Sequence, residues 1–175
     1  MKAIVIVDRK LGMGVDGGLQ FRLPDDLKYF AQQTRDKILV MGRATLEAMP
    51  GGQPLPYRRN IVLTRQKDYQ VAGAEVVHSI EELAGLIGNR PGDEVMLIGG
   101  GRLFEQLLPC CDTALVTKVD AEHRADTFFP DLDKLDGWEQ TICAPSQEQN
   151  GLRFRFCAYT NRVVRPLVPE NADKA

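Results

Sequence analysis

The chain has few of the residues that form metal sites or disulfide frameworks. Its 175 residues include two histidines and only four cysteines: Cys110, Cys111, Cys143 and Cys157. No Cys-x-x-Cys motif is present, and His78 and His123 are far apart in the sequence, so no zinc site is predicted. Adjacent cysteines such as Cys110 and Cys111 are poorly suited to a disulfide with each other. We therefore expect reduced thiols, as in a cytoplasmic protein.

A dominant charge and long apolar runs are also lacking. The net charge is −2, and the densest basic spot is the pair Arg58-Arg59. We therefore expect no nucleic-acid or membrane partner. No apolar segment is long enough to cross a bilayer, and the run over residues 1–8 is too short for a signal peptide and is typical of a strand.

What is present is the composition of a globular protein, with 43% hydrophobic and 26% charged residues. A chain of 175 residues suits one domain with a sizeable core. We expect that domain over residues 1–161, acting as a monomer in the cytoplasm. Two prolines and several polar residues predict a flexible tail over residues 162–175.

Apolar strands alternate with helical segments along most of the chain, which predicts an α/β fold with a mostly parallel central sheet and flanking helices. Strands are expected over 3–7, 37–41, 60–63, 75–77 and 94–98, and helices over 24–34, 42–49, 80–87 and 101–108. Three closing strands, over 113–119, 138–143 and 153–160, have no helix between them and predict an antiparallel edge. Residues 8–22 are expected to form a long glycine-bearing loop.

The first glycine cluster, Gly12 to Gly17, matches the letters of the dinucleotide fingerprint G-x-G-x-x-G. That fingerprint requires a helix directly after the turn, and here Gly18, Gln20 and Pro24 delay the helix, so we reject a Rossmann site. A mobile loop beside a site and an ordinary surface loop are the two remaining interpretations.

The second glycine cluster, Gly99 to Gly101, follows an apolar strand directly and opens a helix. Free amide groups at such a junction bind phosphate, although a tight turn is the alternative. Gly42-Arg43-Ala44-Thr45 repeats the arrangement after another strand, and Leu63-Thr64-Arg65 adds a further cation. Together they suit a ligand with a pyrophosphate and one more phosphate. No Gly-Lys-[Ser/Thr] follows any glycine loop, which excludes a Walker-type ATP site.

The run Leu23-Pro24-Asp25-Asp26-Leu27 directs one carboxylate toward an apolar surface. Helical spacing places Asp26 with Leu23 and Phe30, whereas Asp25 lies above Lys28 and Tyr29. An acid among apolar side chains has a raised pKa and can manage a proton. The alternative is that both acids only favour the helix N-terminus through its dipole. Arg58 is either a clamp for a ligand carboxylate or part of a solvated basic turn.

Five motifs in this order resemble those of the dihydrofolate reductase family. They are Leu-Pro-x-Asp-Leu at 23–27, Met-Gly-Arg-x-Thr at 41–45, Pro-Leu-Pro-x-Arg-x-Asn at 54–60, Ile-Gly-Gly-Gly at 98–101 and Asp-Thr-x-Phe-Pro at 126–130. The resemblance covers about residues 3–160. It implies NADPH-dependent reduction of 7,8-dihydrofolate to tetrahydrofolate, an antifolate target in one-carbon metabolism.

The resemblance also implies roles for individual residues. Asp26 would be the catalytic carboxylate, hydrogen-bonded by Thr117, and Arg58 would hold the glutamate α-carboxylate. The other residues expected at the substrate are Ile4, Val5, Ile6, Leu19, Leu27, Phe30, Met49, Leu55 and Ile98. Residues expected at NADPH are Ile6, Met13, Gly14, Gly18, Leu19, Gly42, Arg43, Ala44, Thr45, Leu63, Thr64, Arg65, Ile98, Gly99, Gly100, Gly101, Arg102, Leu103 and Phe104. Family members carry a cis peptide bond at the position of Gly99-Gly100.

The chain departs from the family pattern in the loop before the acid. Phe21 stands where most members have a Trp whose indole N–H holds a water, and Gln20 stands where Pro is usual. Two other functions remain open from the residues alone. One is reduction of a riboflavin-pathway pyrimidine on a similar fold, against which Asp26 and Arg58 argue. The other is a non-catalytic nucleotide-binding module, which would need no buried acid.

Overall fold

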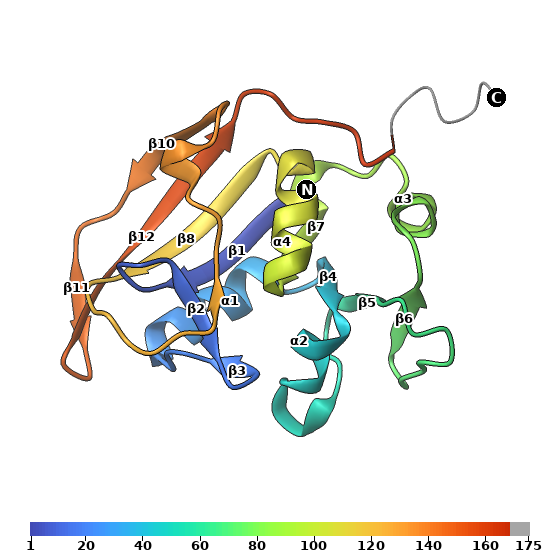
Figure 1. Ribbon diagram of the computed structural model, residues 1–175, viewed down its shortest axis with the longest axis horizontal. Helices are drawn as coiled ribbons and strands as arrows, with labels where there is room; N and C mark the ends of the chain where they lie inside the picture. Colours follow the sequence, from blue (N-terminus) through green and yellow to red (C-terminus); the bar gives the residue numbers. More distant parts are fainter. Residues whose placement is uncertain (169–175) are drawn as a thin grey trace.

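The computed structural model describes residues 1–168 and contains a mixed nine-stranded sheet (Figure 1). The strands run in the order β10-β12-β8-β1-β7-β4-β5-β6, and β11 pairs with β12. Their bounds are β1 Lys2–Val7, β4 Ile38–Gly42, β5 Arg59–Leu63, β6 Ala74–Val77, β7 Val95–Gly99, β8 Thr113–Val119, β10 Trp138–Cys143, β11 Gln147–Gln149 and β12 Leu152–Asn161. The helices are α1 Pro24–Thr34, α2 Arg43–Glu47, α3 Ile80–Ile87 and α4 Gly101–Leu107.

Strand directions confirm the expected fold class. β1 runs parallel to β7 on one side and β8 on the other, and β4 runs parallel to β7 and β5. β12 runs antiparallel to β8 and β10, which makes the predicted antiparallel edge. The parallel strands therefore all end at one edge of the sheet, where α/β proteins place their ligands.

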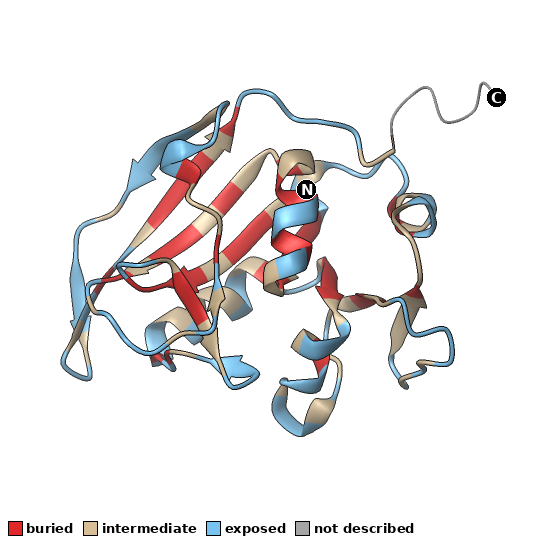
Figure 2. Cartoon of the chain, in the orientation of Figure 1, coloured by how far each residue is buried: buried red, intermediate tan, exposed pale blue. Residues whose placement is uncertain are grey.

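Alternation along the strands divides the core between the two faces of the sheet. Figure 2 shows how many residues of the central strands are buried. On one face Val40 and Leu97 pack with Leu103 and Phe104 of α4. On the other face a smaller cluster lies beneath α1 and α2, formed by Ile4, Leu39, Met41, Leu46, Val62 and Met96. α1 therefore lies on the opposite face of the sheet from α4.

The predicted capping box at α3 is present in altered form. Ser79 Oγ accepts a hydrogen bond from Glu82 N at 3.1 Å, as the motif requires. The Glu82 carboxylate, however, accepts from His78 N at 2.8 Å instead of from Ser79 N. The helix still begins and ends where expected, because the Ser79 bond fixes its first turn.

Residues 8–22 are not a plain loop, which corrects the sequence interpretation. They contain the hairpin of β2 (Gly12–Val15) and β3 (Gly18–Leu19), and β2 also pairs with β9 (Thr127–Phe128). The turn residues Asp16 and Gly17 have φ of 50° and 78°. Two positive φ values define a type I′ hairpin turn, for which Asp-Gly is a preferred sequence. The dipeptide was thus the signal for this hairpin.

Residues 162–168 lie along the body of the domain. Arg165 N donates to Pro109 O at 2.9 Å, and Cys110 Sγ donates to Pro166 O at 3.5 Å. Leu167 packs against the α4-side core. The rest of the expected tail, 169–175, falls outside the described residues. The four cysteines are all free thiols.

Candidate active site

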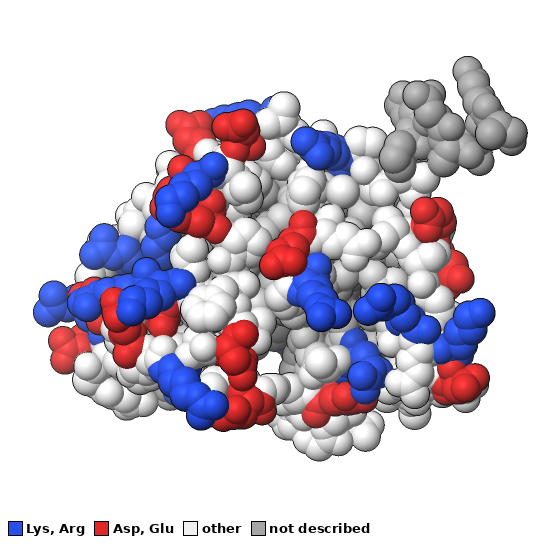
Figure 3. All heavy atoms as spheres, in the orientation of Figure 1, with Lys and Arg blue, Asp and Glu red and all other residues white. Residues whose placement is uncertain are grey.

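The candidate site lies where the parallel strands end. Gly42 ends β4, Leu63 ends β5 and Gly99 ends β7 at the same sheet edge. The surface is hollowed between the β2–β3 hairpin and α2, and Lys and Arg side chains lie over α2 and near the lower end of α4 (Figure 3). An anionic ligand is thereby favoured on the α2 side of the hollow.

Asp26 lies in the first turn of α1, on the apolar floor of this site. Pro24 occupies the first helical position and Leu23 precedes it without a side-chain cap, so α1 begins through backbone geometry alone. Burial raises the pKa of Asp26 above its ordinary value, and a hydrogen bond with the side chain of Thr117 partly opposes that rise. Asp25 instead is exposed, and its N–H donates to Gln149 Oε1 at 2.9 Å. The two adjacent acids thus have different environments.

Apolar side chains surround the expected substrate position. Phe30, Leu55 and Ile98 pack on the cluster that contains Ile4, and Ile6 packs with Phe21 and Leu23. Met49 is half-buried just beyond α2. Leu19 and Leu27 are 49% and 42% exposed, so their side chains are accessible to a ligand. Val5 differs from its neighbours Ile4 and Ile6, because strand alternation directs its side chain to the α4 side of the sheet, away from the expected substrate position.

Tyr29 of α1 packs against Phe156 of β12. Their ring centroids are 4.3 Å apart and the planes are tilted by 35°. Burial and the nearby Asp26 carboxylate both raise the pKa of Tyr29. Tyr29 is therefore close enough to Asp26 for the carboxylate charge to affect it, and Phe156 packs against Tyr29.

Arg58 is held by the end of α1 and is no solvated turn. Its Nε and Nη2 donate to Thr34 Oγ1 at 3.2 and 3.1 Å, Nη2 also donates to Ala31 O at 3.1 Å, and Nη1 donates to Pro56 O at 2.7 Å. Arg59 points elsewhere and forms a bidentate pair with Glu75 at 2.6 and 2.9 Å. These bonds fix the Arg58 guanidinium against the end of α1.

The two glycine junctions lie side by side. A Cβ on Gly42 would be 3.8 Å from Gly100 N, and a Cβ on Gly100 would be 3.3 Å from Thr45 Oγ1. The Gly99-Gly100 peptide bond is cis, as the resemblance implies. Neither α2 nor α4 has a side-chain cap, so their first-turn amides stay available to a ligand. The donor set therefore fits a pyrophosphate.

The basic residues expected at the far end of the cofactor lie around these junctions. Arg43 opens α2 and forms an exposed pair with Glu47 at 2.9 Å. Arg65 and Arg102 are exposed, and Thr64 follows β5 with its carbonyl 2.9 Å from His78 Nδ1. Ala44 is exposed in α2, and Leu63 is half-buried.

The β2–β3 hairpin carries the other residues expected at NADPH and lies against the start of α4. A Cβ on Gly101 would meet Met13 Cε at 3.3 Å, so the loop touches the start of α4. Gly14 O accepts from Asp126 N at 3.0 Å, and Gly18 is exposed at the hairpin tip. Leu103 and Phe104 are buried beneath the junction, with Phe104 stacked edge-on against Phe129 at 4.9 Å.

Sequence reasoning missed Asp8, which anchors the hairpin. The side chain is only 3% exposed and accepts four hydrogen bonds: from Lys10 N and Gly12 N, each at 2.8 Å, from Gln20 Nε2 at 2.9 Å and from His123 N at 3.2 Å. Burial alone would raise the pKa of Asp8, but these bonds together lower it. Gln20 and Phe21, the two departures from the family pattern, both contribute here, since Phe21 stacks on His123 at 4.8 Å.

Comparisons with known proteins agree with this geometry. A family model described as dihydrofolate reductase matches residues 1–161. The chain is 48% identical over 122 residues to a dihydrofolate reductase of Enterococcus faecium, covering 69% of this chain and 72% of the relative. It is 40% identical over 146 residues to dihydrofolate reductase type 3 of Salmonella typhimurium, covering 82% and 87%. A solved dihydrofolate reductase from Enterococcus faecalis, complexed with NADP(H) and RAB-propyl, is similar with a TM-score of 0.82 and 36% identity over 91% of this chain and 95% of that one.

Proposed function

The chain belongs to the dihydrofolate reductase family, and from that premise we propose how its own residues carry out the NADPH-dependent reduction of 7,8-dihydrofolate to 5,6,7,8-tetrahydrofolate. The observation that carries the proposal is Asp26, a carboxylate whose pKa is raised by burial on an apolar floor. Such a group exchanges a proton near neutral pH more readily than an exposed acid does.

Asp26 accepts hydrogen bonds from the pterin ring and assists protonation at N5. Thr117 orients the carboxylate from β8, and its hydrogen bond opposes the rise in the Asp26 pKa that burial causes. Leu27 and Phe30 cover the pterin and benzoyl rings, which excludes water from the reacting face. Arg58, already oriented by Thr34 and Ala31, holds the glutamate α-carboxylate.

NADPH, when bound, supplies the hydride that C6 of the pterin receives. Thr45 would hold its pyrophosphate through the hydroxyl, and the segment from Gly100 to Leu103 would hold it through the uncapped amides at the start of α4. Arg43, Thr64 and Arg65 take the 2′-phosphate, which gives preference for NADPH over NADH. Ile6, Met13 and the hairpin at Gly14 to Leu19 border the nicotinamide.

Among residues 1–168, no helix is long and apolar enough to traverse a bilayer. We propose a monomer that acts in the cytoplasm on a small molecule, with no nucleic-acid or membrane partner, and with the reductase domain over residues 1–161. Sedimentation at micromolar concentration tests the first point, since a dimer mass would contradict it.

The adjacent acids allow a matched test of the proposed proton path. Wild type should oxidise NADPH on addition of dihydrofolate, and oxidise NADH far more slowly. Asp26→Asn should lose hydride transfer at neutral pH and recover part of it at low pH, where the substrate arrives protonated. Asp25→Asn is the control and should resemble wild type, because Asp25 is exposed and contributes only its backbone N–H.

Two results would overturn the proposal. Turnover of Asp26→Asn at wild-type rates across pH would make Asp26 a helix-terminal acid only. Folded wild type that binds NADPH but does not oxidise it with dihydrofolate would favour a nucleotide-binding module or a reductase of another substrate.

A further inference from the structure

Two cysteines face each other across the antiparallel edge of the sheet. Cys143 of β10 is paired in register with Cys157 of β12, and their Sγ atoms are 3.0 Å apart. Ala144 N donates to Phe156 O at 2.8 Å, which makes Cys143 and Cys157 a non-hydrogen-bonded pair. Opposite Cα atoms at such positions are about 4.5 Å apart, within the range that a disulfide spans.

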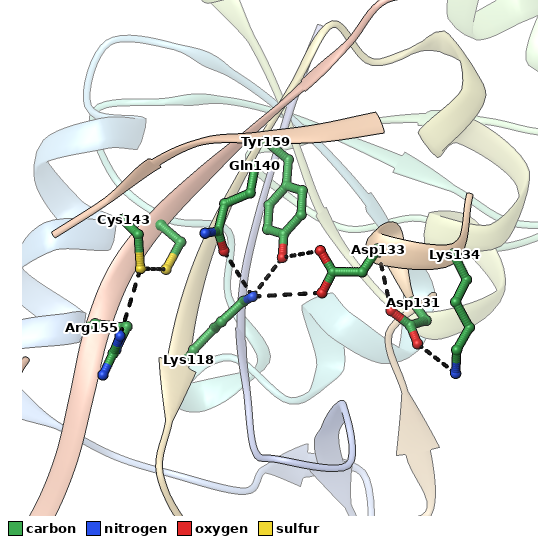
Figure 4. A network of polar contacts seen from close by, with 9 residues as sticks. Lys118, Asp131, Asp133, Lys134, Gln140, Cys143, Arg155 and Tyr159 are labelled. Atoms are coloured by element: carbon green, nitrogen blue, oxygen red, sulfur yellow. Dashed lines mark hydrogen bonds and ion pairs between the residues drawn. The ribbon is translucent and has the colours of Figure 1, made fainter. Parts of the chain in front are cut away.

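The two thiols have unequal surroundings. Cys143 is exposed near the end of β10, with Arg155 Nη1 4.0 Å from its sulfur (Figure 4). A hydrogen bond from Cys157, together with Arg155 and Lys118, lowers the pKa of Cys143. Cys157 is 3% exposed, and burial raises its pKa. The Cys143 thiol is therefore accessible and has a pKa below that of an ordinary cysteine, whereas the Cys157 thiol behind it has a raised pKa.

Cationic and polar side chains hold this region in place. Lys118 of β8 donates to Gln140 Oε1 at 3.0 Å and to the Tyr159 hydroxyl, and Tyr159 donates to Asp133 Oδ1 at 2.9 Å (Figure 4). These contacts join β8, β10 and β12 around the thiol pair. The cysteines are therefore kept opposite each other on three linked strands.

We propose that Cys143 and Cys157 form a redox-sensitive dithiol that a hydroperoxide closes into a reversible cross-strand disulfide. In the first step the Cys143 thiolate attacks one peroxide oxygen, the O–O bond breaks, and Cys143 sulfenic acid and hydroxide form. In the second step the Cys157 sulfur displaces the hydroxyl group, which leaves as water with the Cys157 proton. Two thiols lose two electrons, and hydrogen peroxide becomes two waters.

The other two cysteines provide an internal comparison. The thiol of Cys111 is buried and donates to Leu107 O, and burial raises its pKa to about 12. Cys110 donates to Pro166 O, and burial raises its pKa as well. Neither is expected to react first. Cys157 also packs in the α4-side core, on the other face of the sheet from Ile4, so the proposal does not depend on the proposed function.

The test treats the full, reduced chain with equimolar hydrogen peroxide and follows it by intact mass and peptide mapping. We expect a loss of 2 Da, a Cys143–Cys157 cross-linked peptide, free Cys110 and Cys111, and full reversal by dithiothreitol. Cys143→Ser, an exposed change, should abolish the cross-link. Cys110→Ser is the matched control and should keep it.

Cys157→Ser should stop at the Cys143 sulfenic acid, which dimedone traps. Because that buried change can disturb folding, the wild-type peptide map decides the matter by itself. Sulfinic acid at Cys143 without a cross-link, dimers joined through Cys143, an unreacted pair, or prior oxidation of Cys110 and Cys111 would each overturn the proposal.

Discussion

Replacing Asp8 with Ala should destabilise the protein more than any loss of a surface acid. The substitution removes the acceptor for four donors at 2.8 to 3.2 Å. An unpaired buried N–H costs about 1–3 kcal/mol, and that of Gly12 is buried. The other three donors are partly buried and regain some water, and removal of a buried charge offsets part of the loss. We expect the free energy of unfolding of Asp8→Ala to be lower by about 2–4 kcal/mol, out of a total of about 5–15 kcal/mol for a typical domain.

Asp8→Asn is the matched control, because it removes the negative charge of Asp8 and keeps one oxygen that accepts hydrogen bonds. The remaining oxygen can still accept from Lys10 N and Gly12 N. The new amide faces Gln20, whose Oε1 has no partner among the described residues and can accept after an amide flip. We therefore expect Asp8→Asn to lower the free energy of unfolding by only about 1–2 kcal/mol.

The stability that Asp8 contributes should decrease as the pH falls. The pKa of Asp8 is lowered in the folded protein, so its stabilisation is present above the ordinary value of 3.8 and is lost as the pH falls through the folded value. Urea unfolding at pH 7 and then below pH 4 measures this: the gap between wild type and Asp8→Asn should narrow in acid. A loss under about 1 kcal/mol for Asp8→Ala, or a gap independent of pH, would refute the reasoning.

Three further outcomes follow from the site. Asp26→Asn should raise the thermal midpoint of the ligand-free protein at pH 7 and not at pH 3, because the raised pKa makes the ionised acid destabilising; equal midpoints at pH 7 would contradict this. Thr117→Val should move the pH–rate profile of hydride transfer to higher pH, since the bond that lowers the Asp26 pKa is lost; stopped-flow rates across pH test it. Arg58→Ala should weaken folate binding in titration calorimetry and leave NADPH binding nearly intact, whereas Arg59→Ala should change neither; equal weakening of both ligands would mean that Arg58 is misplaced.

Local sequence signals predicted the elements that depend on local contacts. The helix over Pro24–Thr34 was predicted with its observed bounds, because proline at its first position and an apolar stripe are both visible in the sequence. The antiparallel edge followed from the lack of a helix between strands. The Asp16-Gly17 hairpin was also readable locally and was missed, because the glycine cluster was treated as one loop.

Features that depend on distant partners could not be predicted from spacing. Asp8 accepts from His123, which is separated from it by most of the chain. The bonds of Arg58 to Thr34 and Ala31 argue against a solvated turn, and no residue near position 58 in the sequence indicates them. Likewise, no pattern indicates that Cys143 and Cys157 are in register; that depends on how β10 pairs with β12.

The central place of β1 has a consequence for synthesis of the chain. Lys2 pairs with Met96 on one side and with Thr113 on the other. An emerging chain therefore exposes both edges of an apolar strand until β7 and β8 leave the ribosome. Unpaired apolar strands invite association with other chains, and late pairing of distant strands is slow. A nascent chain stopped before residue 119 should therefore require a holding chaperone, and release past that point should end the requirement.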